Sequence, residues 1–335
     1  MAGKPKPLSL ALQGGGAHGA YTWGVLDALL EDGRISPRAI TATSAGAMNA
    51  AALAHGWVEN GADGARTSLE RFWRAVASHG AAFRPLLPGA AFARFVPFLD
   101  ALSRLTSPYD LNPFDVDPLR DILGQQIDFE RLRAQNDIRL FVTATCVTTG
   151  RAEVFSGERL SMQAVLASAC LPFLRQAVEI DGEPYWDGGF TGNPALWPLF
   201  YADTPGDLLI VHINPLHRPG TPKSADDIMN RVNEITFNAS LMAELRAVAF
   251  VKRLIEDDLL VESEKKRLRN VNMHAIRADE ALSGYTAASK YDTSWAFLTR
   301  LRDLGRQAGQ DWLSTCFDAV GRRSSIDVRA DYLGR

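Results

Sequence analysis

Two short motifs near the start of the chain contain groups that could catalyse acyl transfer. Residues 14–19 read Gly-Gly-Gly-Ala-His-Gly, and Ser44 follows about twenty-five residues later within Ala-Thr-Ser-Ala-Gly. Consecutive glycine amides can stabilise a developing oxyanion, because no side chains shield them. A serine at a sharp strand-to-helix turn can act as a nucleophile. Together, the motifs predict a serine nucleophile beside a glycine-built anion site.

The glycine motif alone also matches a dinucleotide-binding fingerprint, which would indicate an oxidoreductase. In that case, the second strand should end in an acidic residue that binds the ribose. Here the strand at 39–43 ends in Ser44, and Asp32 comes too early, at the end of the intervening helix. The dinucleotide interpretation is therefore disfavoured.

The residues around Ser44 suit a nucleophile at such a turn. Ala42 and Gly46 are small, as close backbone approach requires, and the helix-forming run 45–53 would direct unpaired amides and a positive dipole end at the site. Ser44 could instead serve only as the N-cap of that helix. A further candidate lies at 185–189, Tyr-Trp-Asp-Gly-Gly, where Asp187 stands next to two glycines.

With these motifs in order, the chain resembles the patatin-like phospholipases, a family of serine acyl hydrolases that use a Ser-Asp dyad without histidine. A fourth stretch, Ala167-Ser-Ala-Cys-Leu-Pro172, is similar to the family's Ala/Ser-rich segment before the aspartate. The resemblance covers residues 8 to about 200 well and the C-terminal third only loosely.

The resemblance implies that Ser44 is the nucleophile and Asp187 the general base. It implies an oxyanion hole built from backbone amides, namely those of Gly14, Gly15 and Gly16 with help from Ala45. The implied substrate is a lipid or another acyl ester, cleaved without a metal or cofactor. The same dyad would also suit a polyester or thioester hydrolase, and a catalytically silent lipid-binding regulator is a third hypothesis.

Two positions depart from the family pattern. His18 stands where the loop usually has Arg or Lys, and Ala42 stands where glycine is usual. His18 either supports the anion site in a pH-dependent way or is a loop polar group bonded to backbone. A rival mechanism is a Ser-Asp-His triad, for which three histidines follow Asp187 in the chain: His212, His217 and His274. His212, near the end of a strand, is the best of these candidates.

Strand-length apolar runs predict the elements that position these groups, at 8–12, 39–43, 138–147, 208–213 and 271–277. Helical patterns between them favour an α/β fold, with a mostly parallel sheet between two helical layers. Residues 139–155 read as a hairpin at the sheet edge. We expect an acyl hydrolase domain over 8–278 and a helical C-terminal extension over 279–335.

Residues 79–118 interleave large apolar side chains with prolines such as Pro85, Pro88, Pro97, Pro108 and Pro113. Such a segment forms short broken helices. It is either a cap or lipid-docking surface over the site, or a packed irregular connection.

Composition narrows the protein class. The chain has 335 residues, 46% hydrophobic and 22% charged, with a net charge of −3, so a nucleic-acid partner is not expected. Three widely spaced cysteines predict reduced thiols. We find no signal peptide and no apolar run long enough to span a membrane. We therefore expect a cytoplasmic protein, with peripheral membrane contact left open. The sequence does not predict the oligomeric state.

Overall fold

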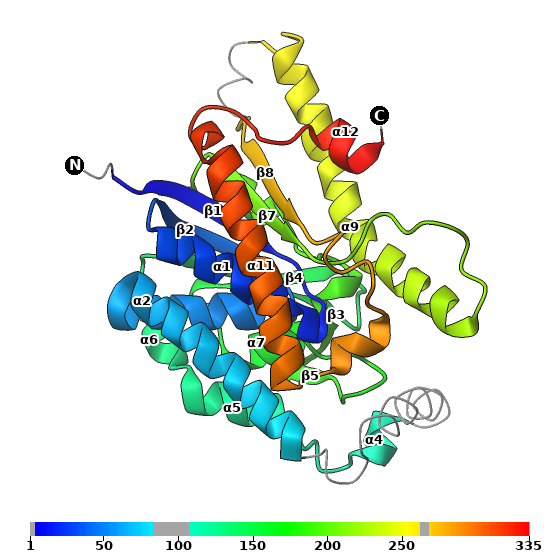
Figure 1. Cartoon of the computed structure of the whole chain (residues 1–335). Helices are drawn as coiled ribbons and strands as arrows, with labels where there is room; N and C mark the ends of the chain where they lie inside the picture. Colours follow the sequence, from blue (N-terminus) through cyan, green and yellow to red (C-terminus); the bar gives the residue numbers. More distant parts are fainter. Residues whose placement is uncertain (1–3, 83–106, 262–267, 335) are drawn as a thin grey trace.

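A computed structural model of the chain describes residues 4–82, 107–261 and 268–334 (Figure 1). Its centre is a mixed eight-stranded sheet in the order β5-β6-β3-β2-β1-β7-β8, with β4 also paired to β3. The strands are β1 (Lys6–Leu12), β2 (Ile35–Ala42), β3 (Arg139–Cys146), β4 (Ala152–Ser156), β5 (Val178–Ile180), β6 (Glu183–Asp187), β7 (Asp207–His212) and β8 (Asn272–Arg277). All five strand-length runs identified in the sequence form strands.

The parallel strands bring two predicted motifs to one edge of the sheet. Leu12, the last residue of β1, is in register with Ala42 of β2 and Val211 of β7. The chain leaves β1 into the glycine loop and leaves β2 into Ser44. Because the carboxyl ends of neighbouring parallel strands lie together, the loop and the serine emerge side by side.

Strand β3 explains how a later segment reaches the same edge. The antiparallel β4 covers one side of β3, as the sequence predicts for a hairpin edge. On the other side, β2 pairs with residues 139–142 and antiparallel β6 pairs with residues 144–146. Strand β6 therefore continues the sheet where β2 stops, and its last residue, Asp187, arrives just beyond the end of β2.

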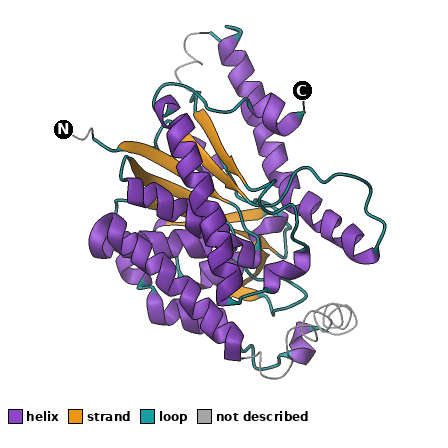
Figure 2. Cartoon of the chain, in the orientation of Figure 1, coloured by secondary structure: helices purple, strands orange, loops and turns teal. Residues whose placement is uncertain are grey.

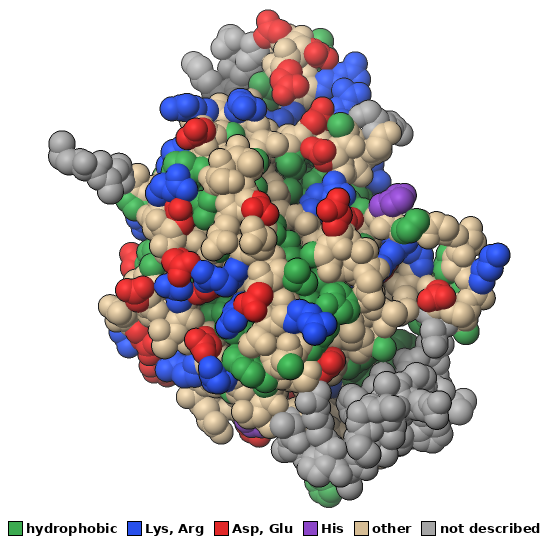
Figure 3. Space-filling view, viewed as in Figure 1, with side chains coloured by type: hydrophobic (Ala, Val, Ile, Leu, Met, Phe, Trp, Pro, Cys, Tyr) green, Lys and Arg blue, Asp and Glu red, His purple; other side chains and the backbone are tan. Residues whose placement is uncertain are grey.

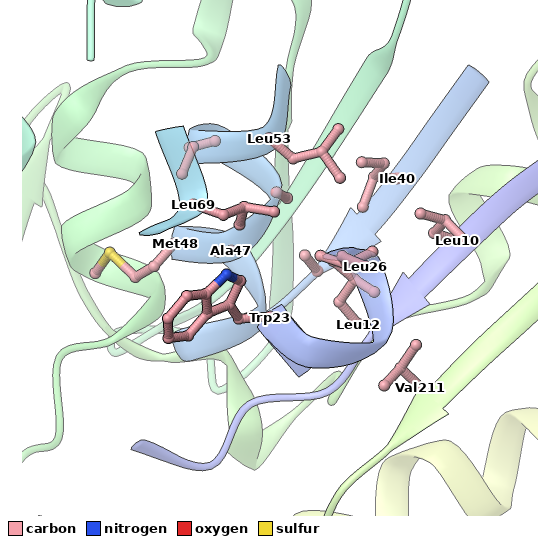
Figure 4. Packing of buried hydrophobic residues seen from close by; sticks show 14 of the residues in the cluster. Leu10, Leu12, Trp23, Leu26, Ile40, Ala47, Met48, Leu53, Leu69 and Val211 are labelled. Atoms are coloured by element: carbon pink, nitrogen blue, oxygen red, sulfur yellow. The ribbon is translucent and has the colours of Figure 1, made fainter. Parts of the chain in front are cut away.

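Helices cover both faces of the sheet, which confirms the three-layer α/β/α fold (Figure 2). Along β1, Leu10 and Leu12 face a cluster with α1 (Gly19–Asp32), α2 (Ala45–Ala82) and α11 (Trp295–Cys316). Ala11 faces a second cluster with α8 (Trp197–Tyr201), α9 (Ala225–Glu256) and α12 (Val328–Leu333). Figure 4 shows Leu10 and Leu12 packed near Trp23 and Leu26 in the first cluster. Alternate residues of a strand point to opposite faces, so each face of β1 is buried.

The other described helices are α4 (Pro108–Leu111), α5 (Pro118–Gln126), α6 (Phe129–Ala134) and α7 (Met162–Ser168). Short 3₁₀ helices are η1 (Gly16–His18), η3 (Gly157–Arg159), η4 (Gly188–Phe190), η5 (Ala287–Tyr291) and η6 (Phe317–Ala319). Helix α2 bends at Asn60 and Gly61, where the backbone is not helical.

Most of the proline-broken segment 79–118, for which we expect a cap or a connection, lies outside the described residues. Across residues 4–82, 107–261 and 268–334, no helix combines the length and apolarity needed to cross a bilayer. Basic and acidic side chains are interspersed on the face seen in Figure 3. Among the described residues, opposite charges form pairs such as Arg66 with Asp27. Among the residues drawn in colour, that face shows no broad basic patch.

The C-terminal region is helical, as expected, and α11 packs tightly along α1. A Cβ atom added to Gly24 of α1 would lie 1.9 Å from the Arg302 carbonyl oxygen, and one added to Gly305 of α11 would lie 2.0 Å from the Tyr21 carbonyl oxygen. The two helices therefore touch backbone to backbone. The boundary between 278 and 279 stays a prediction.

Candidate active site

Ser44 occupies the strained turn between β2 and α2. Its φ is 54°, a left-handed value that a serine rarely adopts, and 8% of the residue is exposed. The turn is tight, because a Cβ on Gly46 would lie 2.3 Å from the carbonyl oxygen of Leu12. Ala42 is fully buried at the end of β2, so a methyl group is accommodated where the family usually has glycine.

Asp187 ends β6, and its side chain is almost completely buried. Its Oδ1 accepts a 2.7 Å hydrogen bond from the amide of Gly189, while its carbonyl accepts one of 2.8 Å from Thr145 Oγ1. The Ser44 side chain is close enough to the Asp187 carboxyl to lower its pKa. The structure therefore brings together the two side chains that the sequence analysis singled out.

Burial raises the pKa of Asp187 from 3.8 to about 7. The bond from Gly189, the neighbouring Ser44 side chain and the positive charge of Lys290 each act in the opposite direction and favour the carboxylate. A carboxyl group with this pKa is partly ionised near neutral pH and can exchange a proton with a neighbouring hydroxyl.

The end of helix α7 holds both Ser44 and Asp187. The Ser44 amide donates to Ser168 Oγ at 2.8 Å, and the Asp187 amide donates to the Cys170 carbonyl, also at 2.8 Å. Thr43 Oγ1 donates to the Gly192 carbonyl at 2.6 Å and ties the elbow to the segment after Asp187. These contacts fix the relative position of two segments that are more than 140 residues apart.

The glycine loop passes directly over Ser44. A Cβ on Gly14 would lie 2.7 Å from that of Ser44, so only glycine fits there. Gly14 is held by two asparagines: its amide donates to Asn193 Oδ1 at 2.7 Å, and its carbonyl accepts from Asn214 Nδ2 at 2.8 Å. The Gly14 amide is thus committed to a protein acceptor, which differs from the expectation that it faces an anion.

A buried amide network lies beneath this loop. Gln13 Oε1 accepts from the amides of Ile213 and Asn214 at 2.8 Å, and its Nε2 donates to Asn238 Oδ1 at 2.9 Å. Asn238 in turn donates to the Asn214 carbonyl. Buried polar groups of this kind are stable only when they are paired, so the network fixes the loop's backbone.

His18 is a neutral structural residue in this arrangement. It is 3% exposed, its Nε2 hydrogen-bonds to Ser289 Oγ at 2.7 Å, and its ring packs near Tyr285 and Phe297. Burial lowers its pKa to about 3, assisted by the positive charges of Lys290 and Arg218. Of the two hypotheses for His18, the geometry favours a loop polar group, although its partner is a hydroxyl and not the backbone.

The histidines considered for a triad have other partners or positions. His212 Nε2 lies 2.9 Å from Asn238 Oδ1, an acceptor, so this nitrogen carries the proton, and burial lowers the pKa of the ring. His274 lies between Asp207 Oδ1, at 3.0 Å, and Ser325 Oγ. His217 is exposed. None of the three has a hydrogen bond to Asp187 in the described part of the chain.

A cavity lies away from Ser44 and Asp187, and the described side chains offer no metal site. This cavity of about 430 Å³ is formed by the loop after β7, the start of α9 and the loop before η5, and neither Ser44 nor Asp187 lines it. In the described ranges, His, Cys, Asp and Glu side chains form no group of three suited to a metal ion.

Several residues that build the site have no sequence pattern that predicts their role. Ser168 lies in the Ala/Ser-rich stretch 167–172, but no local pattern predicts its contact with Ser44. Asn193 and Asn214 follow strands or turns and could have been flagged as polar residues near the sheet edge. Lys290 stands in the C-terminal third, and no motif marks it.

Comparison with known proteins identifies the family. Residues 10–200 match the family described as patatin-like phospholipase, and the chain belongs to this family. Membership supports, in general terms, an enzyme that hydrolyses lipid esters. The match ends well before Lys290, so the C-terminal third lies outside the shared region.

Solved structures with a similar backbone course share little sequence identity with this chain. VipD from Legionella pneumophila is 18% identical, with a TM-score of 0.44 over 94% of this chain and 67% of that chain. Full-length ExoU of Pseudomonas aeruginosa, solved with SpcU, is 15% identical, with a TM-score of 0.32 over 93% of this chain and 54% of that chain. This chain thus spans about half the length of ExoU. Among curated proteins, none matches the chain.

Proposed function

We propose that the chain hydrolyses carboxyl esters of lipids through an acyl-enzyme on Ser44, with Asp187 as the general base. One observation carries this proposal: a buried carboxyl group lies beside the side chain of a serine in a strained strand-to-helix turn and is affected by it. The pKa of Asp187, raised to about 7, suits a base that works near neutral pH. His212 bonds to Asn238 instead, which argues for a dyad over a triad.

In the first half of the reaction, Asp187 takes the Ser44 proton while the serine oxygen attacks the ester carbonyl carbon. The carbonyl oxygen becomes an oxyanion in the tetrahedral intermediate. When that intermediate collapses, the C–O bond to the alcohol breaks, and the alcohol leaves with the proton from Asp187. Water then attacks the acyl-serine with Asp187 as base again, which releases the carboxylic acid and restores Ser44.

We assign stabilisation of the oxyanion to the amides of Gly15, Gly16 and Ala45. Gly15 and Gly16 follow Gly14 in the loop that passes over Ser44, and Gly16 has the left-handed φ of 59°. Ala45 is the first residue of α2, and the first amides of a helix have no partner within it. The positive end of the α2 dipole adds to the same effect. The Gly14 amide is excluded because it bonds to Asn193.

A fluorophosphonate probe tests the nucleophile directly, because it phosphonylates an activated serine. We expect one adduct per wild-type chain by intact-protein mass spectrometry and none in Ser44→Ala. Ser78→Ala is the matched control: this serine is on α2, and its hydroxyl bonds to the Arg74 carbonyl. It should label like wild type. Folded wild type that stays unlabelled, or labelling that survives in Ser44→Ala, would contradict the proposal.

The substrate class needs a separate experiment. Wild type and Ser44→Ala should be compared on phospholipids, neutral lipid esters, a soluble polyester and acyl thioesters. We expect Ser44-dependent release of fatty acid from lipid esters. If turnover depended on Ser44 but occurred only with polyesters or thioesters, the dyad would stand and the lipid assignment would be wrong.

A further inference from the structure

Lys290 places a positive charge against the glycine loop from a distant part of the chain. It lies in η5, which packs on η1. A Cβ on Gly16 would lie 2.6 Å from the Lys290 carbonyl oxygen and 3.3 Å from its Cβ. The backbone of Lys290 therefore touches the loop at the position where the loop adopts its left-handed turn.

The ammonium group of Lys290 is connected to the loop through one side chain. Its Nζ donates to Asn214 Oδ1 at 2.8 Å, and Asn214 Nδ2 donates to the Gly14 carbonyl at 2.8 Å. The same Nζ lies 5.5 Å from the ring centroid of Phe237, and that ring would lie 2.3 Å from a Cβ on Gly189. Lys290 thus stands between the glycine loop and the turn that follows Asp187.

The loop itself supplies no cation. His18 is neutral, because its pKa is about 3. The charges of Glu234, Asp187 and Arg218 all act on Lys290. Glu234 is already paired with Arg218, at 2.7 Å, and with Arg231, at 3.1 Å. Asp187, by contrast, forms no ion pair with another cation among the described residues.

We infer that Lys290 is a positioning residue of the site: its ammonium holds the Gly14–Gly16 loop through Asn214, and its charge stabilises negative charge on Asp187 and on the oxyanion. This inference rests on the proposed function. A cation in a partly buried site acts strongly on nearby anions, because little water screens it. Lys290 thereby supplies from η5 the positive charge that His18 does not provide.

The first test separates the charge of Lys290 from its hydrogen bond. Lys290→Gln removes the charge but keeps a donor for Asn214, whereas Lys290→Arg keeps the charge. Lys252→Gln is the matched control, because Lys252 is also partly buried and donates to the carbonyl of Val271, which directly precedes β8 and lies away from the site. The readout is kcat/KM against pH with a soluble ester.

In the profile of kcat/KM against pH, the rise on the acid side, or acid limb, reports the ionisation of Asp187. We expect this rise to move to higher pH in Lys290→Gln, because the carboxylate loses a stabilising positive charge. Below pH 7, kcat/KM should fall roughly five- to tenfold, since each unit of pKa shift costs tenfold in ionised base. Burial lowers the pKa of Lys290 itself to about 8, so wild type should also lose activity above that pH. Lys290→Arg should keep the acid limb and extend activity to higher pH. An acid limb in Lys290→Gln that coincides with wild type and Lys252→Gln would overturn the inference.

A second readout keeps this test independent of turnover. The carboxyl ¹³C resonance of Asp187, assigned by its absence in Asp187→Asn, can be titrated in wild type and Lys290→Gln. A higher pKa in Lys290→Gln supports the inference even if no ester is cleaved, in which case only the proposed function fails. Identical titration curves would overturn the inference while leaving the Ser44 labelling result intact.

Discussion

The backbone amide of Ser44 donates to the hydroxyl of Ser168, which is fully buried at the end of α7, over a distance of 2.8 Å. This bond restrains a residue whose φ of 54° is strained. Two residues further along, the Cys170 carbonyl accepts from the Asp187 amide. A single helix end therefore sets the spacing between the proposed nucleophile and its base.

Ser168→Ala should lower kcat more than it raises KM. The substitution leaves the Ser44 amide without its acceptor and lets the strained turn relax, so the hydroxyl drifts from Asp187. We expect a loss in kcat on the order of tenfold to a hundredfold, as for small misplacements of a catalytic group. Steady-state kinetics on a soluble ester, with stability followed by urea unfolding, provide the measurement.

Ser161→Ala is the control for Ser168→Ala, because Ser161 caps the other end of the same helix and accepts from the Ala164 amide at 3.2 Å. It should cost about 1 kcal/mol of stability and leave kcat nearly unchanged. Equal losses of kcat in the two variants would mean that α7 acts only through general stability.

Much of this arrangement could be predicted because its signals are local. Apolar runs bounded by turns predict the parallel strands, and the spacing of glycines and Ser44 predicts a loop and an elbow at one sheet edge. Asp187 could be placed beside Ser44 only through the family resemblance. The pairing of β6 with the part of β3 beyond β2 explains that proximity, and it is a long-range contact without a local signature.

The residues that could not be predicted act across long separations. Asn193 and Asn214 bind Gly14 from about 180 and 200 residues away, and Lys290 reaches Asn214 from 76 residues further along. The neutral state of His18 depends on burial by Tyr285 and Phe297 and on nearby charges, none of which the sequence around residue 18 reveals.

The activity of wild type should rise with pH through an acid limb near 7. Asp187 must be ionised to take the Ser44 proton, and its pKa is about 7, so protonation at lower pH removes the base. Asp187→Asn should abolish turnover at every pH. His212→Gln, which keeps a donor for Asn238, should retain most activity and the same limb. Loss of activity in His212→Gln with activity retained in Asp187→Asn would reverse the assignment of the base.

Asp187→Asn should stabilise the protein at pH 8 and have little effect at pH 4. An unfolded aspartate ionises near 3.8, whereas burial raises the folded-state pKa to about 7. Between these values the folded state binds more protons, so stability falls as pH rises and the penalty is complete above pH 7. Asparagine removes the penalty, which is at most about 4 kcal/mol at about 1.4 kcal/mol per pKa unit.

This stability prediction is checked by urea unfolding of wild type and Asp187→Asn at pH 4, 6 and 8. The difference in the free energy of unfolding should grow with pH. If the difference in the free energy of unfolding were the same at all three pH values, ionisation of Asp187 would not destabilise the folded state. Its assignment as a base with a raised pKa would then be weakened.

We propose that α11 and α1 form one folding unit across the predicted boundary at 278/279. Gly305→Ala, a substitution in α11, should therefore destabilise the whole fold. Alanine is the better helix former by about 1 kcal/mol, so an isolated helix would gain stability. Here the added Cβ would lie 2.0 Å from the Tyr21 carbonyl oxygen, a backbone atom that cannot move aside without shifting α1. We expect a net loss of about 1–3 kcal/mol in a single unfolding transition.

In Gly284→Ala, where no atom lies within 4 Å of the new Cβ, stability should stay within about 0.5 kcal/mol of wild type. If Gly305→Ala instead produced an early separate transition, with the remainder as stable as wild type, the C-terminal region would be an independent extension. A helix that buries Leu298 and Leu301 completely in the cluster shared with β1 should not separate in this way.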